Sequence, residues 1–163
     1  MTEAELGWVA GVFEGEGNVG IHTHQCLRGG ILRRQAQVQV SITNTDVRMV
    51  LRVAEITGLG RVRPKKPHGN NRRPQWRWHA AAAQARAFLL MVMPYLVTKR
   101  EQAEKALDQS FAQLSQRGKG ALSTSQWRDY LRRKAELRAL VAWRPGQNEV
   151  AIAVEDREPS LPL

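Results

Sequence analysis

The amino-acid sequence predicts a single α+β domain in which helices alternate with pairs of antiparallel strands. Its 163 residues, 42% of them hydrophobic, are enough to bury one core. The spacing of apolar residues changes from a helical period to strict alternation, and it does so twice before the chain becomes helical throughout. Segments containing glycine or proline separate these stretches, as turns require. These three observations predict the fold class.

The first helix is predicted to run from Glu3 to about Glu14. Thr2 and Glu5 have the Thr-x-x-Glu spacing of a capping box, in which each side chain bonds to the other residue's backbone and fixes the start of a helix. Small residues recur at helical spacing on one face of this helix. We expect a second helix to pack closely against that face, which contains Gly7, Ala10 and Gly11.

Two acidic residues, Glu14 and Glu16, lie at the C-terminal end of this helix. The unpaired carbonyl groups there carry partial negative charge, so two further carboxylates favour the binding of a cation. Gly15 and Gly17 permit a sharp change from helix to strand and leave backbone oxygen accessible. Oxygen ligands of this kind suit a hard metal ion such as Mg²⁺. A helix that simply ends in solvated acids is the alternative interpretation.

Two strands are predicted next, the first beyond Gly17 and the second from about Ile31 to Thr43, with a hairpin tip between them. The second strand alternates apolar residues with polar residues that include no carboxylate. Arginine pairs with guanine edges and glutamine with adenine edges, and a two-stranded ribbon fits the major groove of DNA. We favour a base-reading face over an ordinary solvated one; it contains Asn18, His22, His24, Arg33, Gln35, Gln37 and Gln39.

A second helix is predicted from Asp46, a suitable N-cap, to about Thr57, and Gly58 closes it. Two further alternating strands follow. Their polar residues extend the same basic face and comprise Arg61, Arg63, Lys65, Gln75 and Arg77, with Lys65, Arg72 and Arg73 expected nearer to phosphates.

Trp76 and Trp78 alternate with the polar residues of the fourth strand. This alternation places both indoles on the same side as Val62, so we expect them in the core. A stacking platform for unpaired bases is the alternative function of this pair.

Three helices are predicted in the remainder of the chain. The first is alanine-rich and ends at Pro94. Thr98 and Glu101 have the spacing of a second capping box, from which a helix is expected to reach about residue 116. Lys99 then lies in the first turn, where the helix dipole disfavours a cation unless an anion such as a phosphate is nearby. The last helix is expected over about residues 125–142.

The charge of the chain indicates a polyanionic partner, and nucleic acid is the first to test. Lys and Arg outnumber Asp and Glu by 25 to 15, and the sequence pI is about 10.8. Residues 146–163 carry −3 and residues 1–145 therefore carry +13. We expect one domain over 1–145, followed by a mobile acidic tail over 146–163.

The sequence argues against a membrane protein and against a disulfide or zinc framework. It contains no run of 18 apolar residues and no signal-peptide pattern. We therefore expect an intracellular protein, in the cytoplasm or in an organelle matrix. Cys26 is the single cysteine, which excludes an internal disulfide. His22, His24 and Cys26 lack the further ligand pair of a zinc finger, so histidines that face DNA are the better interpretation.

Four segments between Glu5 and Asp108 resemble the LAGLIDADG homing endonucleases of the single-motif type. They are VAGVFEGEG at residues 9–17, VSITNTD followed by ITGLGRV, WRWH, and PYLVTKREQAE, in the order that the family has them. The resemblance implies an αββαββα fold with a four-stranded antiparallel DNA-binding sheet and extra C-terminal helices. It also implies a homodimer, formed through the motif helices, that cuts both strands of a long pseudo-palindromic DNA site in a Mg²⁺-dependent reaction. Such reading frames are mobile elements that lie in introns or inteins.

The resemblance also assigns roles at the ends of the helices. Glu16 and Lys99 would be catalytic, Glu16 and the Gly15 carbonyl would bind the metal, and Glu14 would support the junction. Both acids are Glu where the motif has Asp, which retains the ligand chemistry. A further polar residue organises water in the family; Thr43, Asn44 and Thr45 are the candidates here.

Two other functions fit the same fold. One is an RNA-binding maturase that acts on intron RNA, for which Arg128, Arg132 and Arg133 on the last helix are the only indication. The other is a regulator that binds DNA without cutting it. We favour the endonuclease because neither Glu16 nor Lys99 has been lost.

Overall fold

The computed structural model describes residues 1–28, 31–66, 73–108 and 122–141. The elements follow in the predicted order, and the α+β fold class is confirmed. Their bounds are α1 (Glu3–Glu16), β1 (Gly17–Arg28), β2 (Ile31–Asn44), α2 (Val47–Thr57), β3 (Arg61–Lys65), β4 (Gln75–Ala81), α3 (Ala83–Val92), the short 3₁₀ helix η1 (Met93–Tyr95), α4 (Arg100–Leu107) and α6 (Thr124–Val141).

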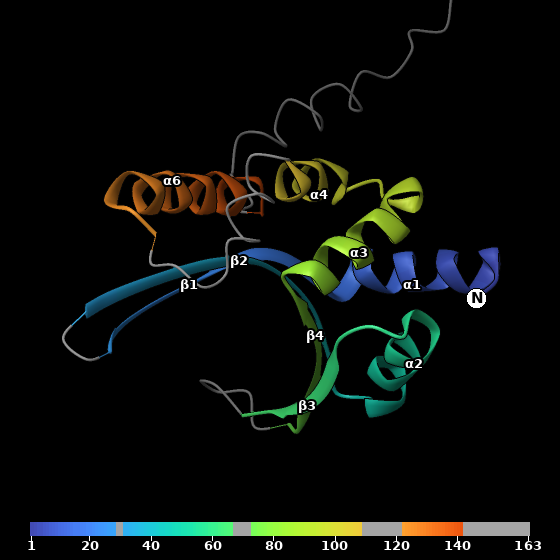
Figure 1. Cartoon of the computed structure of the whole chain (residues 1–163). Helices are drawn as coiled ribbons and strands as arrows, with labels where there is room; N and C mark the ends of the chain where they lie inside the picture. Colours follow the sequence, from blue (N-terminus) through green and yellow to red (C-terminus); the bar gives the residue numbers. More distant parts are fainter. Residues whose placement is uncertain (29–30, 67–72, 109–121, 142–163) are drawn as a thin grey trace, which may run out of the picture.

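The four strands form one antiparallel sheet in the order β1-β2-β4-β3. β1 and β2 pair along their whole length, from Gly17 opposite Ile42 to Arg28 opposite Ile31. β4 pairs only with the end of β2, from Gln39 to Asn44, so the rest of the β1–β2 hairpin projects as a two-stranded ribbon. Figure 1 shows the sheet curved into an arch, with α1, α3, α4 and α6 on its convex side and none of the described helices under the arch.

The helices cover the apolar face of the sheet that the alternation predicted. Val38, Val40 and Ile42 of β2 are buried there, and so is Trp78 of β4. The Trp78 ring lies 4.7 Å from the ring of Phe88, which in turn packs edge-on against Phe13 of α1 at 5.0 Å. This aromatic cluster joins α1, α3 and the sheet in one core.

The core interpretation of the tryptophan pair is confirmed for Trp78. Its side chain has no exposed surface, and its Nε1–H donates to the Leu59 carbonyl oxygen at 2.8 Å. Trp76 is half-buried against the same core. A stacking platform is therefore wrong for Trp78, because a buried indole presents no face to a base.

The predicted start of α1 and both ends of α2 are confirmed. Thr2 and Glu5 form the reciprocal capping box, and α1 extends two residues further than expected, to Glu16. Asp46 caps α2 by accepting from the Arg48 N–H at 2.9 Å, and Gly58 ends the helix at φ +64°.

The predicted capping box at the start of α4 is wrong. Lys99 is the N-cap and no side chain caps the helix, because the Thr98 hydroxyl instead donates to Glu14 of α1. α4 also ends at Leu107 rather than near residue 116, since Asp108 leaves helical geometry at φ −44° and ψ 127°. The remainder of that predicted helix and the acidic tail lie outside the described residues.

Helix α6 covers the apolar side of the projecting β1–β2 ribbon (Figure 1). Near its start, Arg34 of β2 donates to the Thr124 hydroxyl at 3.2 Å and lies over the Trp127 ring. Near its middle, Lys134 Nζ donates to the Thr23 hydroxyl of β1 at 2.7 Å. Both strands of the ribbon are thus attached to one helix, which supports a pair of strands that is only marginally stable alone.

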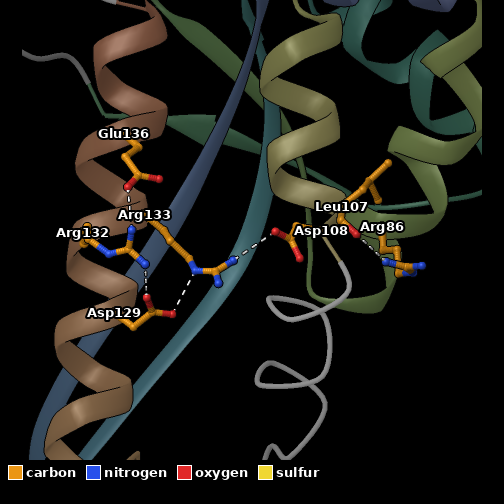
Figure 2. A network of polar contacts seen from close by, with 7 residues as sticks. All are labelled: Arg86, Leu107, Asp108, Asp129, Arg132, Arg133 and Glu136. Carbon is orange, nitrogen blue, oxygen red and sulfur yellow. Dashed lines mark hydrogen bonds and ion pairs between the residues drawn. The ribbon is translucent and has the colours of Figure 1, made fainter.

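Polar contacts connect α6 to α4 and α4 to α3 (Figure 2). Arg133 of α6 pairs with Asp108 at 3.5 Å, and Arg86 of α3 donates to the Leu107 carbonyl oxygen at 3.2 Å. Among the residues described, no helix combines the length and the apolar content needed to cross a bilayer.

Candidate nucleic-acid interface and active site

The concave face of the sheet collects polar side chains in rows that run across the strands. One row contains Asn18, Ser41, His79 and Arg61, and the next contains Thr43, Arg77 and Arg63. Further pairs are His22 with Gln37, His24 with Gln35, Gly20 with Gln39, and Gln75 with Lys65. The structure therefore brings the predicted residues of all four strands onto one face.

Three further residues of this face were not among those expected to contact DNA: Ser41, His79 and Thr43, the last of which was a candidate for organising water. Each alternates with core residues just as its predicted neighbours do, so strand parity alone could have identified it. Three predicted residues cannot be compared in this way, and one of them, Arg73, is exposed in the bend before β4. The Arg33 backbone pairs with Cys26 but its side chain lies outside the described part, and Arg72 lies wholly outside it.

The rows carry positive charge and contain no carboxylate. Arg77 lies between Thr43 and Arg63, and its Nε is buried with no hydrogen-bond partner among the described residues. A buried donor without an acceptor costs free energy, typically about 1–3 kcal/mol. This arrangement favours a ligand that supplies acceptor atoms, as base edges and phosphates do.

A groove of about 690 Å³ lies along this face and ends at the C-terminal end of α1. Its lining includes residues of all four strands, the last residue of α1 and three residues of α6: Glu16, Asn18, Val19, Gly20, Ile21, His22, Gln39, Ser41, Thr43, Lys65, Arg77, Lys134, Leu137 and Arg138. The groove thus places one carboxylate, that of Glu16, among residues that are otherwise neutral or cationic.

Glu16 and Glu14 have different surroundings although they are two residues apart. The Glu16 side chain is exposed at the groove and forms no hydrogen bond or ion pair with a described residue. The Glu14 carboxylate is half-buried and accepts from the backbone N–H groups of Val97, Thr98 and Lys99 at 2.9, 3.1 and 3.2 Å. The Thr98 hydroxyl donates to it as well. These contacts give Glu14 the supporting role expected for it.

The hydrogen bonds determine the ionisation of Glu14. Burial of the carboxyl acts to raise its pKa, but the bonds from Thr98, Val97 and Lys99 outweigh burial and hold the pKa below its ordinary value of 4.5. Because the folded pKa is depressed, the stabilisation is fully present above about pH 4.5 and is lost as the pH falls through the folded pKa.

Lys99 is the cation at the end of α1. Its Nζ donates to the Glu14 carbonyl oxygen, one of the carbonyls left unpaired where that helix ends. The lysine therefore offsets the negative end of the α1 dipole, and this contact gives its position at the start of α4 a reason other than a phosphate. This contact holds the Lys99 ammonium group at the Glu14 carbonyl, and Glu14 lies two residues before Glu16 along the chain.

Replacing Glu14 by glutamine is expected to lower the free energy of unfolding by about 2 kcal/mol at pH 7, because an amide NH₂ would face backbone donors. The difference from wild type should shrink as the pH falls below about 4.5 and through the lower pKa of the folded carboxyl, because the wild type then loses the stabilisation given by its ionised carboxylate. Urea denaturation at pH 7, 5 and 3.5 measures both effects. Glu104→Gln, the same change at an exposed position of α4, is the control and should show neither. Equal stability of Glu14→Gln and wild type at pH 7 would contradict this role.

The donors present fit a hard metal ion only in part. No group of three or more His, Cys, Asp or Glu side chains that could hold a metal occurs in the described residues. Glu16 and the Gly15 carbonyl supply oxygen, the donor type that Mg²⁺ prefers, and Mg²⁺ is usually held by one or two carboxylates with water and phosphate. The two residues thus fit a metal whose other ligands come from outside this chain.

The small-residue face of α1 is partly open. Gly7, Gly11 and Gly15 have no neighbouring atom within 4 Å of an added Cβ, and the adjacent Trp8 is 40% exposed. Ala10 was predicted on this face, but it is 1% exposed and belongs to the protomer's own core. The open stripe therefore consists of glycines four residues apart, which share one side of a helix.

The three candidates for a water-organising residue differ in the contacts that their side chains make. The Asn44 side-chain oxygen accepts from the Asp46 N–H at 2.8 Å and so belongs to the start of α2. Thr43 lines the groove and pairs across the sheet with Arg77, whereas Thr45 is exposed beyond the strand. Thr43 is thus the candidate whose side chain reaches the site.

The fold is similar to those of solved homing endonucleases. The homing endonuclease I-CvuI, in complex with I-CreI target DNA, gives a TM-score of 0.65 at 20% identity over 87% of this chain and 85% of that chain. The archaeal intron-encoded I-Vdi141I complexed with DNA gives 0.63 at 16% identity, over 95% and 96%. The LAGLIDADG meganuclease I-AabMI bound to uncleaved DNA gives 0.57 at 14% identity, over 91% of this chain and 48% of that chain. Neither the protein-family models nor the curated proteins searched match the sequence.

Proposed function

We propose that this chain, which has the fold of the LAGLIDADG homing endonucleases, is a metal-dependent endonuclease that cuts double-stranded DNA as a homodimer. The observation that carries the proposal is the carboxylate-free polar face of the sheet, which ends at the exposed carboxylate of Glu16. The face offers donors of the kind that base edges and phosphates accept. Glu16 supplies the acid that phosphodiester hydrolysis with a metal requires.

The dimer is proposed from three features. Each chain contributes a single carboxylate to the groove, that of Glu16, so a metal bound there needs further ligands from outside the chain. The Gly7, Gly11 and Gly15 stripe permits close approach of a second helix. The chain also matches 48% of I-AabMI, so it corresponds in size to half of that DNA-bound protein. Two α1 helices packed along the stripe would bring two copies of Glu16 together at the two-fold axis.

In such a dimer, each residue of the site would have a separate role in the reaction. Glu16 from each copy, with the Gly15 carbonyl, would hold Mg²⁺, which supplies positive charge that offsets the carboxylates and polarises the scissile phosphate. Lys99, held at the end of α1, places a second positive charge beside the reacting phosphate and stabilises the charge that develops there. Glu14 keeps the Lys99 backbone in position. Arg61, Arg63, Lys65 and Arg77 fix the duplex on the sheet.

Selection from a randomised duplex library tests the DNA-binding and dimer parts of this proposal. The recovered sequences should share a site with dyad symmetry, and two protomers should occupy each duplex in sedimentation. A structured intron-like RNA, added as a competitor, tests the alternative that the protein is a maturase. Stronger retention of the RNA, or one protomer on a full site, would contradict the proposal. We propose that the protein acts in the compartment that contains its host DNA, either the cytoplasm or an organelle matrix.

A further inference from the structure

The two edges of the DNA-facing sheet differ in charge. β3 forms one edge and contributes Arg61, Arg63 and Lys65. β1 forms the other edge and has no Lys or Arg between Gly17 and Leu27. A protein element in the major groove lies between two phosphate backbones, about 12 Å apart. The β3 edge can neutralise one backbone, whereas β1 offers no Lys or Arg to the other before its last residue, Arg28.

Helix α6 supplies the cations that the β1 edge lacks. Lys134 and Arg138, one helical turn apart, line the same groove as the base-reading residues. The Lys134 ammonium is held at the β1 edge by the Thr23 hydroxyl at 2.7 Å. Arg138 is exposed and forms no ion pair with a described residue. Leu137 between them is buried, which fixes this face of α6 on the strand.

The other arginines in the middle of α6 are neutralised within the protein, as Figure 2 shows. Arg132 pairs with Asp129 and with Glu136 at 3.1 Å, and Arg133 pairs with Asp129 at 2.9 Å. At Lys134, by contrast, burial and then the charge of Arg138 lower the pKa, with no carboxylate among the causes. Two cations held close together, with no described carboxylate paired to either, favour the binding of an anion.

We propose that Lys134 and Arg138 form a phosphate-binding pair that binds one DNA backbone along the β1 edge, while β3 binds the backbone of the other strand. The pair would act on every sequence alike, because phosphates carry no base identity. It sets the affinity and orientation of the duplex on the ribbon. The proposal rests on the proposed DNA-binding function.

The salt dependence of DNA binding tests the pair directly. In a dimer, Lys134→Gln with Arg138→Gln removes four phosphate contacts, so the slope of log K against log salt should fall by about 3–4. Arg138→Gln alone changes only an exposed residue and should lower the slope by about 2, and Arg138→Lys should restore it. The matched control is Arg128→Gln with Arg132→Gln, which removes the same charge from α6 outside the groove and should leave the slope within about 1.

The outcomes separate this inference from the proposed function. Equal slopes for the two double variants, or an unchanged slope for Arg138→Gln, would overturn the phosphate-binding pair while DNA binding stands. If wild type itself shows no salt-dependent binding to the duplex, the proposed function and the pair both fail. Thermal unfolding of each variant verifies that α6 is still folded, and the exposed Arg138→Gln variant decides the question if the double variant is not.

Discussion

Replacing Glu16 by glutamine is expected to lower the rate of DNA cleavage by about 10³-fold or more, with duplex affinity within about threefold of wild type. Glutamine keeps the shape of the side chain but removes the charge that a metal ion needs. The fold should be unaffected, because the Glu16 side chain is exposed and contacts no described residue through a hydrogen bond or ion pair. Single-turnover cleavage and fluorescence-anisotropy binding on the same duplex measure the two quantities.

The matched control for this variant is Glu3→Gln. It makes the same chemical change at an exposed position of the same helix, 13 residues from the groove, and should cut at the wild-type rate. If Glu16→Gln cuts within tenfold of wild type, the assignment of Glu16 as the metal-binding acid is wrong. A parallel loss of binding would place Glu16 in the DNA interface instead.

Replacing Gly17 by alanine is expected to lower the free energy of unfolding by about 3 kcal/mol. An added Cβ would lie 2.2 Å from Phe13 Cδ2 and 2.3 Å from the Phe13 carbonyl oxygen. Neither atom can move freely, because the ring packs against Phe88 and the carbonyl accepts from the Gly17 N–H. Only glycine fits where α1 turns directly into β1.

Urea denaturation measures this effect as a lower midpoint at an unchanged m-value. Gly20→Ala, three residues along the same strand, is the control, since its Cβ would meet only the Asn18 side chain at 3.4 Å. It should change the free energy of unfolding by less than about 1 kcal/mol. Equal stability of the two variants would show that the junction relaxes around the extra methyl group.

Local chemistry in the sequence was enough to predict most of the fold. The Thr2–Glu5 capping box, the Asp46 cap and Gly58 each act within a few residues, and all three lie as expected. Strand alternation separated the apolar face, with Val40 and Ile42, from the polar one. Periodicity identifies faces because each side chain is assigned by its own position along a strand.

The predictions that failed depended on contacts between distant segments. Thr98 satisfies the local pattern of a capping box, yet its hydroxyl bonds to Glu14, 84 residues earlier. Ala10 is as small as its glycine neighbours, but only the packing of α1 on the sheet shows that it faces inward. Lys99 reaches the Glu14 carbonyl oxygen at the end of α1 from the start of another helix, a contact that no spacing within α1 could reveal.

The last helix shows the same limit for the candidate site. From the sequence, Arg132 and Arg133 were among the cations of this helix that indicated RNA binding, and Lys134 was not. The structure pairs those two arginines with acids and brings Lys134 and Arg138 to the groove. A cation on a helix can bind an external anion only if no acidic side chain of the protein pairs with it. One of these acids, Asp108, lies on another segment, so helical spacing alone does not reveal it.

The most direct measurement of the central claim is the cleavage of the selected duplex by the wild-type protein in Mg²⁺, with both strands end-labelled. We expect one break in each strand, at positions related by the dyad of the site, and no breaks when Mg²⁺ is replaced by a chelator. A duplex that is saturated with protein and remains intact in Mg²⁺ would contradict the account and leave a DNA-binding protein without nuclease activity.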